Sequence, residues 1–232
     1  MKVFAISDLH LSINNPKPMD IFGPAWDNYV ENIFADWREK VSEEDLVLLA
    51  GDYSWAMNLA DTEKDFELLR NLPGKKIIIR GKHDYWWKSI SAVRAFLPEG
   101  FYAIQNDALK FDNLVVCGTR GWVVPDRGEL SPEDDKIFKR EVIRLELTLK
   151  EADKLRGEGD KLICMMHYPP VNFRRDDSEF SALLEQYKVD AVVFGHLHGY
   201  KNAQLQFVKN GVPYYLTSCD LTGNKLIEIQ EV

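Results

Sequence analysis

Five short apolar runs in this sequence each end at, or within three residues before, an aspartate or a histidine. The runs lie at residues 2–7, 45–50, 75–80, 161–167 and 190–195. Each has the length and the apolar composition of a buried strand. Amphipathic helical patterns at 26–41 and 61–72 separate the early runs, and such strand–helix–strand units predict a parallel sheet. Because parallel strands end at one edge of a sheet, we expect the polar residues to gather there.

The remaining patterns extend this α/β prediction over the whole chain. Further strands are predicted at 113–118, 204–208, 213–218 and 225–229, and further helices at 131–156 and 177–189. Asn210-Gly211, between two late strands, is typical of a β-hairpin. We therefore expect a mixed sheet, or two sheets, with helices outside, in a single domain over residues 1–232. The stretch 119–131 has little periodicity, which predicts a long functional loop or an excursion over the sheet edges.

Composition and charge argue against several classes of protein. The formal net charge of −8 disfavours a surface that holds nucleic acid, and a nuclease with it. No apolar run approaches the roughly 18 residues of a membrane span. The N-terminus lacks a signal-peptide pattern, and the three cysteines are widely spaced, as in a reducing compartment. We therefore expect a cytoplasmic protein with no membrane or nucleic-acid partner.

All five histidines of the chain stand at predicted strand ends, together with aspartates. The candidate metal ligands are Asp8, His10, Asp52, His167, His196 and His198, and the pair His83-Asp84 follows a further strand. Carboxylate and neutral imidazole together suit Mn, Fe or Zn. Six such groups exceed the needs of one tetrahedral site, so we expect two divalent metal ions with a bridging carboxylate. Two ions about 3.5–4 Å apart can clamp a phosphoryl group.

The order of these motifs resembles that of the calcineurin-like metallophosphoesterase family. Asp-x-His, Gly-Asp, Gly-x-His-Asp, a lone His and Gly-His-x-His follow one another over residues 8–198. The resemblance implies a two-sheet mixed β-sandwich flanked by helices, in α-β-β-α order. It also implies a metal-dependent phosphohydrolase, in which a metal-activated hydroxide attacks the phosphorus of a small phosphomonoester or phosphodiester.

The same resemblance implies a role for each motif residue. The metal assignments are Asp8, His10 and His198 for the first ion, His167 and His196 for the second, and Asp52 as the bridge. His83 would contact the phosphate and protonate the leaving oxygen, a role that typically contributes ~10²–10⁴-fold. Asp84 would orient the His83 imidazole.

Lys82 departs from the family pattern, which has an asparagine there as a ligand of the second metal ion. A protonated lysine offers donors only and cannot ligate a cation. About 4 Å from a divalent ion, it would be repelled by roughly 8 kcal/mol at an effective dielectric near 20. Three interpretations stay open. The ammonium replaces the second ion by pairing with Asp52, the long side chain carries its charge away from a weakened second site, or the amine stays neutral beside the ions.

Substrate contacts are predicted next to the motifs. The aromatic residues next to the metal motifs could form an aromatic wall for a base or an aryl group, or pack as core under the helices. They are Tyr53, Trp55, Tyr85, Trp86 and Trp87. Arg80 could bind phosphate oxygens, and an arginine also precedes this motif in related protein phosphatases, so a phosphoprotein substrate stays an alternative. Lys82 adds another alternative, a non-catalytic or weakly active metal-binding relative. We expect a small-molecule phosphoester as the partner, and the oligomeric state stays open.

Overall fold

The computed structural model describes residues 1–14, 16–200 and 203–231, and within them the strands form two sheets. The first sheet has the order β11-β1-β2-β3-β4. Its strands are β1 (Lys2–Ile6), β2 (Leu46–Leu49), β3 (Lys75–Ile79), β4 (Phe101–Ile104) and β11 (Ile227–Glu231). The second sheet has the order β5-β6-β7-β8-β10-β9. Its strands are β5 (Ala108–Phe111), β6 (Leu114–Thr119), β7 (Lys161–Met166), β8 (Ala191–Phe194), β9 (Gln206–Lys209) and β10 (Val212–Leu216).

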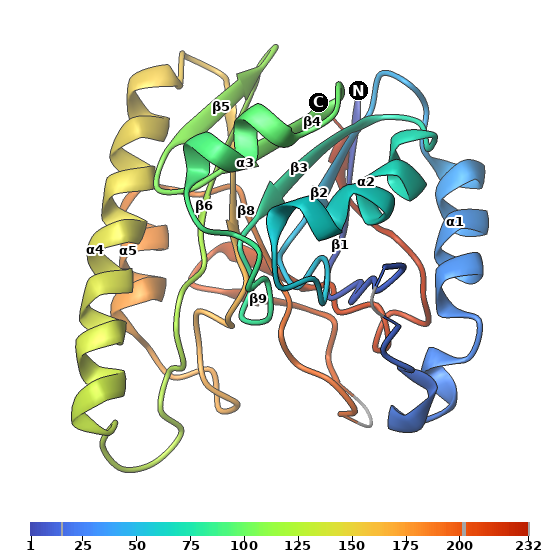
Figure 1. Ribbon diagram of the computed structural model, residues 1–232. Helices are drawn as coiled ribbons and strands as arrows, with labels where there is room; N and C mark the ends of the chain where they lie inside the picture. Colours follow the sequence, from blue (N-terminus) through green and yellow to red (C-terminus); the bar gives the residue numbers. More distant parts are fainter. Residues whose placement is uncertain (15, 201–202, 232) are drawn as a thin grey trace.

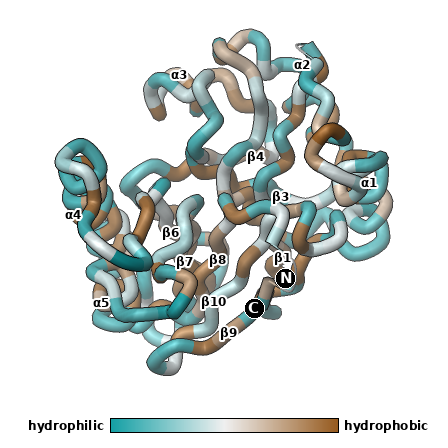
Figure 2. Tube along the Cα trace, turned by 90° about the horizontal axis from the view of Figure 1, so that it is seen from below, coloured by the Kyte–Doolittle hydropathy of each residue, from teal (hydrophilic) through white to brown (hydrophobic). Residues whose placement is uncertain are grey.

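Helices cover the outer face of each sheet. The first sheet carries α1 (Tyr29–Lys40), α2 (Glu63–Arg70) and α3 (Ile90–Phe96), and the second carries α4 (Pro132–Leu155) and α5 (Glu179–Gln186). Short 3-10 turns are η1 (Asp20–Phe22), η2 (Pro24–Trp26) and η3 (Leu59–Thr62). Figure 2 shows the two groups of helices on opposite sides of the sheets. The fold is thus the α-β-β-α sandwich that the family resemblance implied.

Alternation along the strands divides the core into layers. Phe4 and Ile6 of β1 pack in the cluster under α1–α3, whereas Val3 and Ala5 lie in the cluster between the two sheets. Ile163 of β7 reaches the same central cluster from the second sheet. Strands that are buried on both faces need no polar alternation, which explains why they read as continuous apolar runs in the sequence.

Most sequence-based expectations for the elements hold, with three omissions. The predicted strands and helices occur close to their expected bounds, and Asn210-Gly211 forms the hairpin between β9 and β10 with positive φ at both residues. The short elements α3, β4 and β5 were not predicted, because four to seven residues carry too little periodicity. The stretch between β6 and α4 is irregular as expected, and its function stays a prediction.

Cys117, Cys164 and Cys219 are buried and free. Over the part of the chain that the structure describes, no helix is long and apolar enough to cross a membrane.

The carboxyl ends of the parallel strands in both sheets meet at one end of the molecule. β1, β2 and β3 run parallel in the first sheet, as do β7, β8 and β10 in the second. Just past β1, the Ser7 backbone nitrogen donates to Thr217 O at 2.9 Å, and Cys219 N donates to Ser7 O at 3.1 Å. Both termini lie at the opposite end, the top of Figure 1. The motif loops of the two sheets therefore converge.

Candidate metal centre

The six predicted ligands lie together where the two sheets are tied, in two groups of three. The first group is Asp8, His10 and His198, and the second is Asp52, His167 and His196. Within each group the ligand atoms lie within 4.8 Å of one another. These side chains come from the loops after β1, β2, β7 and β8. The grouping agrees with the metal assignments that the resemblance implied, and the assignments themselves stay predictions.

Glycines let the motif loops approach one another closely. A Cβ on Gly81 would lie 2.1 Å from the Asp52 backbone nitrogen, and one on Gly195 would lie 2.4 Å from Asp8 Oδ2. Gly51, with φ of 91°, is confined in the same way. Real Cβ atoms essentially never come so close, so packing requires the glycine before each of these three motifs.

Backbone strain is concentrated at the ligands. Asp8, His10, Asp52 and His196 have φ values of 61°, 46°, 52° and 72°, in the left-handed region that residues with a side chain seldom adopt. Such conformations persist only where the surrounding structure fixes them, and they cluster at functional sites. The fold therefore holds four of the six ligands in a costly conformation.

Asp52 lies between the two ligand groups. Its Oδ1 accepts a hydrogen bond from the His83 backbone nitrogen at 2.6 Å. Its Oδ2 lies 3.8 Å from His10 Nε2 in the first group and 3.5 Å from His167 Nε2 in the second. One carboxylate oxygen is thus near ligand atoms of both groups, which is the placement that a bridging carboxylate requires.

The His167 side chain has the orientation of a metal ligand. Its Nδ1 lies 3.0 Å from the Ala50 carbonyl oxygen, and donation to that oxygen places the ring proton on Nδ1. Its Nε2 is buried near Asp52 and has no hydrogen-bond partner among the described residues. A buried nitrogen without a partner is costly unless a cation takes up its lone pair. The residues present therefore fit a divalent metal ion.

Burial keeps three of the histidines neutral, which is the form that binds metal. It lowers the pKa of His10 to about 3, the pKa of His167 to about 4 and the pKa of His196 to about 3. Burial and the charge of Asp8 raise the pKa of Asp52 well above its ordinary value. A cation would favour the neutral imidazoles and the ionised carboxylate together.

Asp8 is held by hydrogen bonds from three directions. Ser7 Oγ, Ser218 Oγ and the His196 backbone nitrogen donate to its Oδ2 at 2.5, 2.9 and 3.0 Å. Its Oδ1 lies 3.3 Å from His198 Nε2. Burial raises the pKa of Asp8, but the nearby charge of His198 outweighs burial and holds that pKa far below its ordinary value. One oxygen is thus fixed while the other faces the ligand group.

Asp220 positions His198, and sequence reasoning missed this residue. His198 Nδ1 lies 2.9 Å from Asp220 Oδ1, and the Gly199 backbone nitrogen donates to Asp220 Oδ2 at 2.9 Å. Burial lowers the pKa of His198, but the hydrogen bond with Asp220 and the nearby charges of Asp8 and Asp220 outweigh it and raise the pKa to about 10. A carboxylate behind a histidine ligand fixes the orientation of the ring and raises its basicity.

Asp84 has other partners than the expected His83 imidazole. Its carboxylate accepts hydrogen bonds from the backbone nitrogens of Asp52, Tyr53, Ser54 and Gly81 at 3.0, 2.9, 3.2 and 2.7 Å, and from Trp86 Nε1 at 3.0 Å. Asp84 is fully buried. It therefore fixes the loop after β2 against the loop after β3, because both loops donate to one carboxylate. Its task is to position backbone.

The His83 ring lies at the surface of the centre. The centroid of the His83 ring lies 5.7 Å from that of His10 and 4.7 Å from that of Trp55. His83 Nδ1 lies 3.4 Å from the Tyr85 hydroxyl. The ring is half-buried, and burial followed by the charge of Lys82 lowers its pKa. His83 thus stands beside the first ligand group and within reach of solvent.

Lys82 is exposed at the mouth of the centre. In the described parts of the chain, no hydrogen bond or ion pair joins its side chain to another residue. Burial is the larger influence on both neighbouring histidines, but the charge of Lys82 also lowers the pKa of His83 and of His196. The ammonium therefore does not pair with Asp52, which disfavours the interpretation in which it replaces the second ion.

The predicted aromatic residues divide between the core and the candidate metal centre. Tyr53 and Trp86 are 2% and 0% exposed and belong to the core cluster under α1–α3. The Tyr53 hydroxyl donates to Asp65 O at 2.9 Å, and its ring stacks on Phe66. Trp55 of the predicted set does line the centre, stacked on His10 at 4.7 Å. Trp26 and Tyr168 also contact ligand histidines. Helices packed over the loop decide which rings reach the site.

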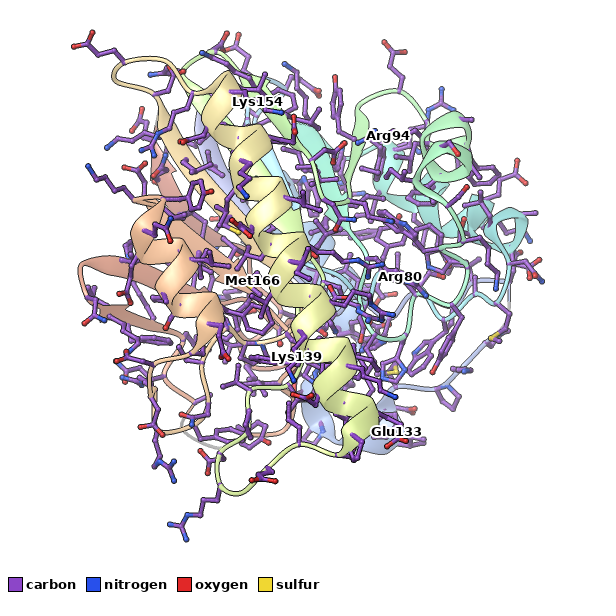
Figure 3. All side chains as sticks on the ribbon, turned by 90° about the vertical axis from the view of Figure 1, so that its left-hand side faces the viewer. Arg80, Arg94, Glu133, Lys139, Lys154 and Met166 are labelled. Carbon is purple, nitrogen blue, oxygen red and sulfur yellow. The ribbon has the colours of Figure 1, made fainter. Side chains whose placement is uncertain are left out.

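Arg80 lies beside α4, as Figure 3 shows. Burial and the charges of Arg120 and Arg144 lower its pKa, while Asp84 and Glu141 raise it. Glu141 of α4 is fully buried and pairs with Arg120 at 3.4 Å and Arg144 at 2.6 Å. Arg80 thus borders a charged cluster on the helix, and its contact with substrate stays a prediction.

A family model for calcineurin-like phosphoesterases matches residues 1–200. The chain belongs to this family. All six candidate ligands lie within the matched residues, whereas Asp220 lies beyond them. Membership of the calcineurin-like phosphoesterases implies metal-dependent phosphoester chemistry at the level of the family.

Two solved structures resemble the chain over almost its whole length. A protein of unknown function from Aquifex aeolicus is 14% identical with a TM-score of 0.53, covering 98% of this chain and 95% of that chain. A protein from Thermus thermophilus is 14% identical with a TM-score of 0.59, covering 98% of this chain and 97% of that chain. At this identity the likeness concerns the fold alone. No curated protein matches the chain.

Proposed function

We propose that this calcineurin-like protein is a metal-dependent phosphohydrolase acting on a small phosphomonoester or phosphodiester. The observation that carries the proposal is the pair of three-residue ligand groups, with Asp52 Oδ2 near imidazoles of both. Family membership supports the coarser statement, a metal-dependent phosphoesterase.

Each ligand group would hold one divalent ion, Mn, Fe or Zn. Asp8, His10 and His198 would hold the first, His167 and His196 the second, and Asp52 both. Bound ions would neutralise phosphoryl charge and lower the pKa of a water, so that hydroxide is available at neutral pH to attack phosphorus. The chain's own contribution is to keep the imidazoles neutral by burial and to fix the carboxylates by hydrogen bonds.

His83 would supply the proton to the leaving oxygen. Its ring lies beside His10 at the solvent side of the centre, and its backbone nitrogen is anchored on Asp52. Burial lowers its pKa, but an anionic phosphoester next to the ring favours the protonated form. Lys82 and His83 together would place positive charge at the mouth, where an anion enters.

The alternatives rest on single residues. A protein phosphatase is favoured by Arg80 alone, whose charged neighbours include Glu141 and Arg144 of α4. A non-catalytic relative is favoured by Lys82 alone, which is exposed and leaves the six ligand side chains grouped. We keep the small-molecule partner and the cytoplasmic location as parts of the proposal.

The test is a hydrolysis screen of aryl phosphomonoesters and phosphodiesters with Mn²⁺ or Zn²⁺. We expect metal-dependent hydrolysis of at least one ester class by the natural chain. Asp52→Asn serves as the inactive control because it removes the shared charged oxygen. If neither the natural chain nor Lys82→Asn hydrolyses any ester, the non-catalytic alternative gains and the proposal fails.

A further inference from the structure

A cavity of about 640 Å³ opens beside the second ligand group, a typical volume for a small-molecule site. Its walls come from the loops that follow β6, β7 and β8. Its floor is formed by Phe194, Phe207 and Leu216, which are almost fully buried. The cavity is therefore built on the second sheet and is framed by loops that carry site residues.

The cavity is continuous with the candidate metal centre. His196 belongs to the second ligand group and also lines the cavity. Tyr168 lines it too, with its ring centroid 4.1 Å from that of His196 and 5.4 Å from that of His167. A phosphoryl group at the metal centre would therefore have its organic substituent next to this cavity.

Aromatic side chains gather around the cavity. Phe173 and Tyr200 are 61% and 45% exposed, and their ring centroids are 5.0 Å apart. The Arg175 guanidinium lies 4.3 Å from the centre of the Phe207 ring. Aromatic faces and a guanidinium plane are the groups on which nucleic-acid bases stack.

The wall also holds a buried acceptor without a hydrogen-bond partner. Asn172 is occupied, since its Nδ2 donates to Pro125 O at 3.1 Å, and Gln204 Oε1 accepts from Arg175. Asp126 lines the cavity, and its buried Oδ1 has no hydrogen-bond partner within residues 1–14, 16–200 and 203–231. An ionised carboxylate only accepts hydrogen bonds, so it suits a ligand that carries an N–H donor.

We propose that this cavity binds the base of a small nucleotide, with an amino group of the base donating to Asp126. The inference rests on the proposed function insofar as the phosphate would lie at the metal centre. Stacking comes from the exposed rings of Phe173 and Tyr200, and the acceptor selects bases with an exocyclic amino group. Tyr53 and Trp86 of the expected aromatic wall lie in the core, whereas Phe173 and Tyr200 lie on loops of the second sheet.

The test compares ligands that share sugar and phosphate but differ in the base. The probes are the phosphonate analogues of AMP and of ribose 5-phosphate, which a phosphoesterase does not consume, measured by calorimetry on the Mn²⁺-loaded chain. We expect the AMP analogue to bind roughly tenfold tighter or more, as stacking of one base allows. A purine analogue without the amino group should lose part of this gain. Equal affinities within about twofold would overturn the inference.

Matched variants locate the effect. Phe173→Ala should weaken binding of the AMP analogue and leave the affinity for the ribose analogue unchanged. Phe22→Ala removes an equally exposed ring outside the cavity and should change neither affinity. Asp126→Ala should abolish the preference for the amino group. If the Asp126 and Phe173 variants, folded by their melting curves, both bind like the natural chain, the cavity is not the base site.

The outcome separates this inference from the proposed function. Hydrolysis of 4-nitrophenyl esters is measured on the same preparation. Hydrolysis without a preference for the AMP analogue would leave the phosphohydrolase standing and remove the base site. A preference for the AMP analogue without hydrolysis of any ester would keep the base site and remove the enzyme.

Discussion

Residues next to the ligands determine the geometry of the candidate metal centre as much as the ligands do. Ala50 fixes the tautomer of His167 through its carbonyl oxygen, and Asp220 fixes the ring of His198. Asp84 aligns the loop that carries Asp52. A change at such a position alters a ligand without touching it, so single substitutions can separate metal binding from turnover.

His83→Ala should abolish most turnover and leave the metal content intact. The ring lies beside the first ligand group but in neither group, so its removal deletes a proton donor and no ligand. We expect kcat to fall by roughly 10²–10⁴-fold. Steady-state kinetics and elemental mass spectrometry on one preparation measure both quantities. Unchanged kcat would remove the assigned role.

Lys82→Asn should raise the affinity for the second ion without changing the number of ions bound at saturation. Lys82 is exposed, so the natural chain should hold two ions, the second weakly. Removing one positive charge from the mouth is worth about 1 kcal/mol, roughly fivefold in affinity. Metal titration followed by elemental mass spectrometry measures both values. One ion in the natural chain and two in the variant would show that the ammonium occupies the second site.

Asp220→Ala should lower the affinity of the first ligand group for its metal ion. The variant removes the acceptor behind His198 Nδ1, and loss of such a partner typically costs 10–100-fold in metal affinity. Asp177→Ala is the control, since Asp177 is an exposed aspartate that pairs with Lys209 away from the centre. The dissociation constant for Mn²⁺ is the measurement, and an unchanged constant would contradict the positioning role.

At the scale of elements, strand ends are held together by contacts between loops. Asp84 receives backbone hydrogen bonds from the loops after β2 and β3. On the other sheet, buried Glu141 of α4 pairs with Arg120, whose carbonyl oxygen accepts from the backbone nitrogens of His167 and Tyr168 at 3.1 and 2.9 Å. The outer helix α4 is thereby linked to the second ligand group.

Gly81→Ala should destabilise the fold and empty the second site. Its Cβ would meet the Asp52 backbone nitrogen at 2.1 Å, so the two loops must separate. We expect a cost of about 3 kcal/mol or more, or roughly 6–12 °C in Tm for a chain of this size. Gly159→Ala is the control, because its Cβ meets nothing within 4 Å and only its φ of 82° costs energy, about 1–2 kcal/mol. Equal Tm losses in the two variants would contradict the close-approach argument.

At the scale of the whole molecule, the ligands tie the two sheets to each other. Asp8 and Asp52 follow strands of the first sheet, and His167, His196 and His198 follow strands of the second. Each ligand group therefore takes residues from both sheets. An ion in either group would cross-link the sandwich at the end where Ser7 already bonds to Thr217.

Metal binding should therefore raise the stability of the whole chain. At 100 times the dissociation constant, a ligand that binds only the folded state contributes about 2.7 kcal/mol, or roughly 5–11 °C in Tm. Thermal melts with Mn²⁺ and with EDTA measure the shift. Asp52→Asn should reduce it, because the shared oxygen loses its charge. A Tm that does not respond to any divalent ion would contradict the candidate centre.

The sequence by itself determined most of the strands and helices and the candidate ligand set, because both depend on local order along the chain. A run such as 75–80 is apolar since it is buried on both faces, and that property is visible without knowing its neighbours. Ligands such as Asp52 directly follow their strands, and parallel strands bring their ends together. Asp220 also follows a predicted strand, at 213–218, so the same reasoning could have identified it.

Only the tertiary structure decided which side chains face the centre. Tyr53 and Trp86 point into the core because helices pack over their loop, while Lys82 is exposed a few residues away. The cavity beside His196 is enclosed by loops after three different strands. Burial and direction of a loop residue depend on which distant segment packs against it, and no local pattern in the sequence carries that information.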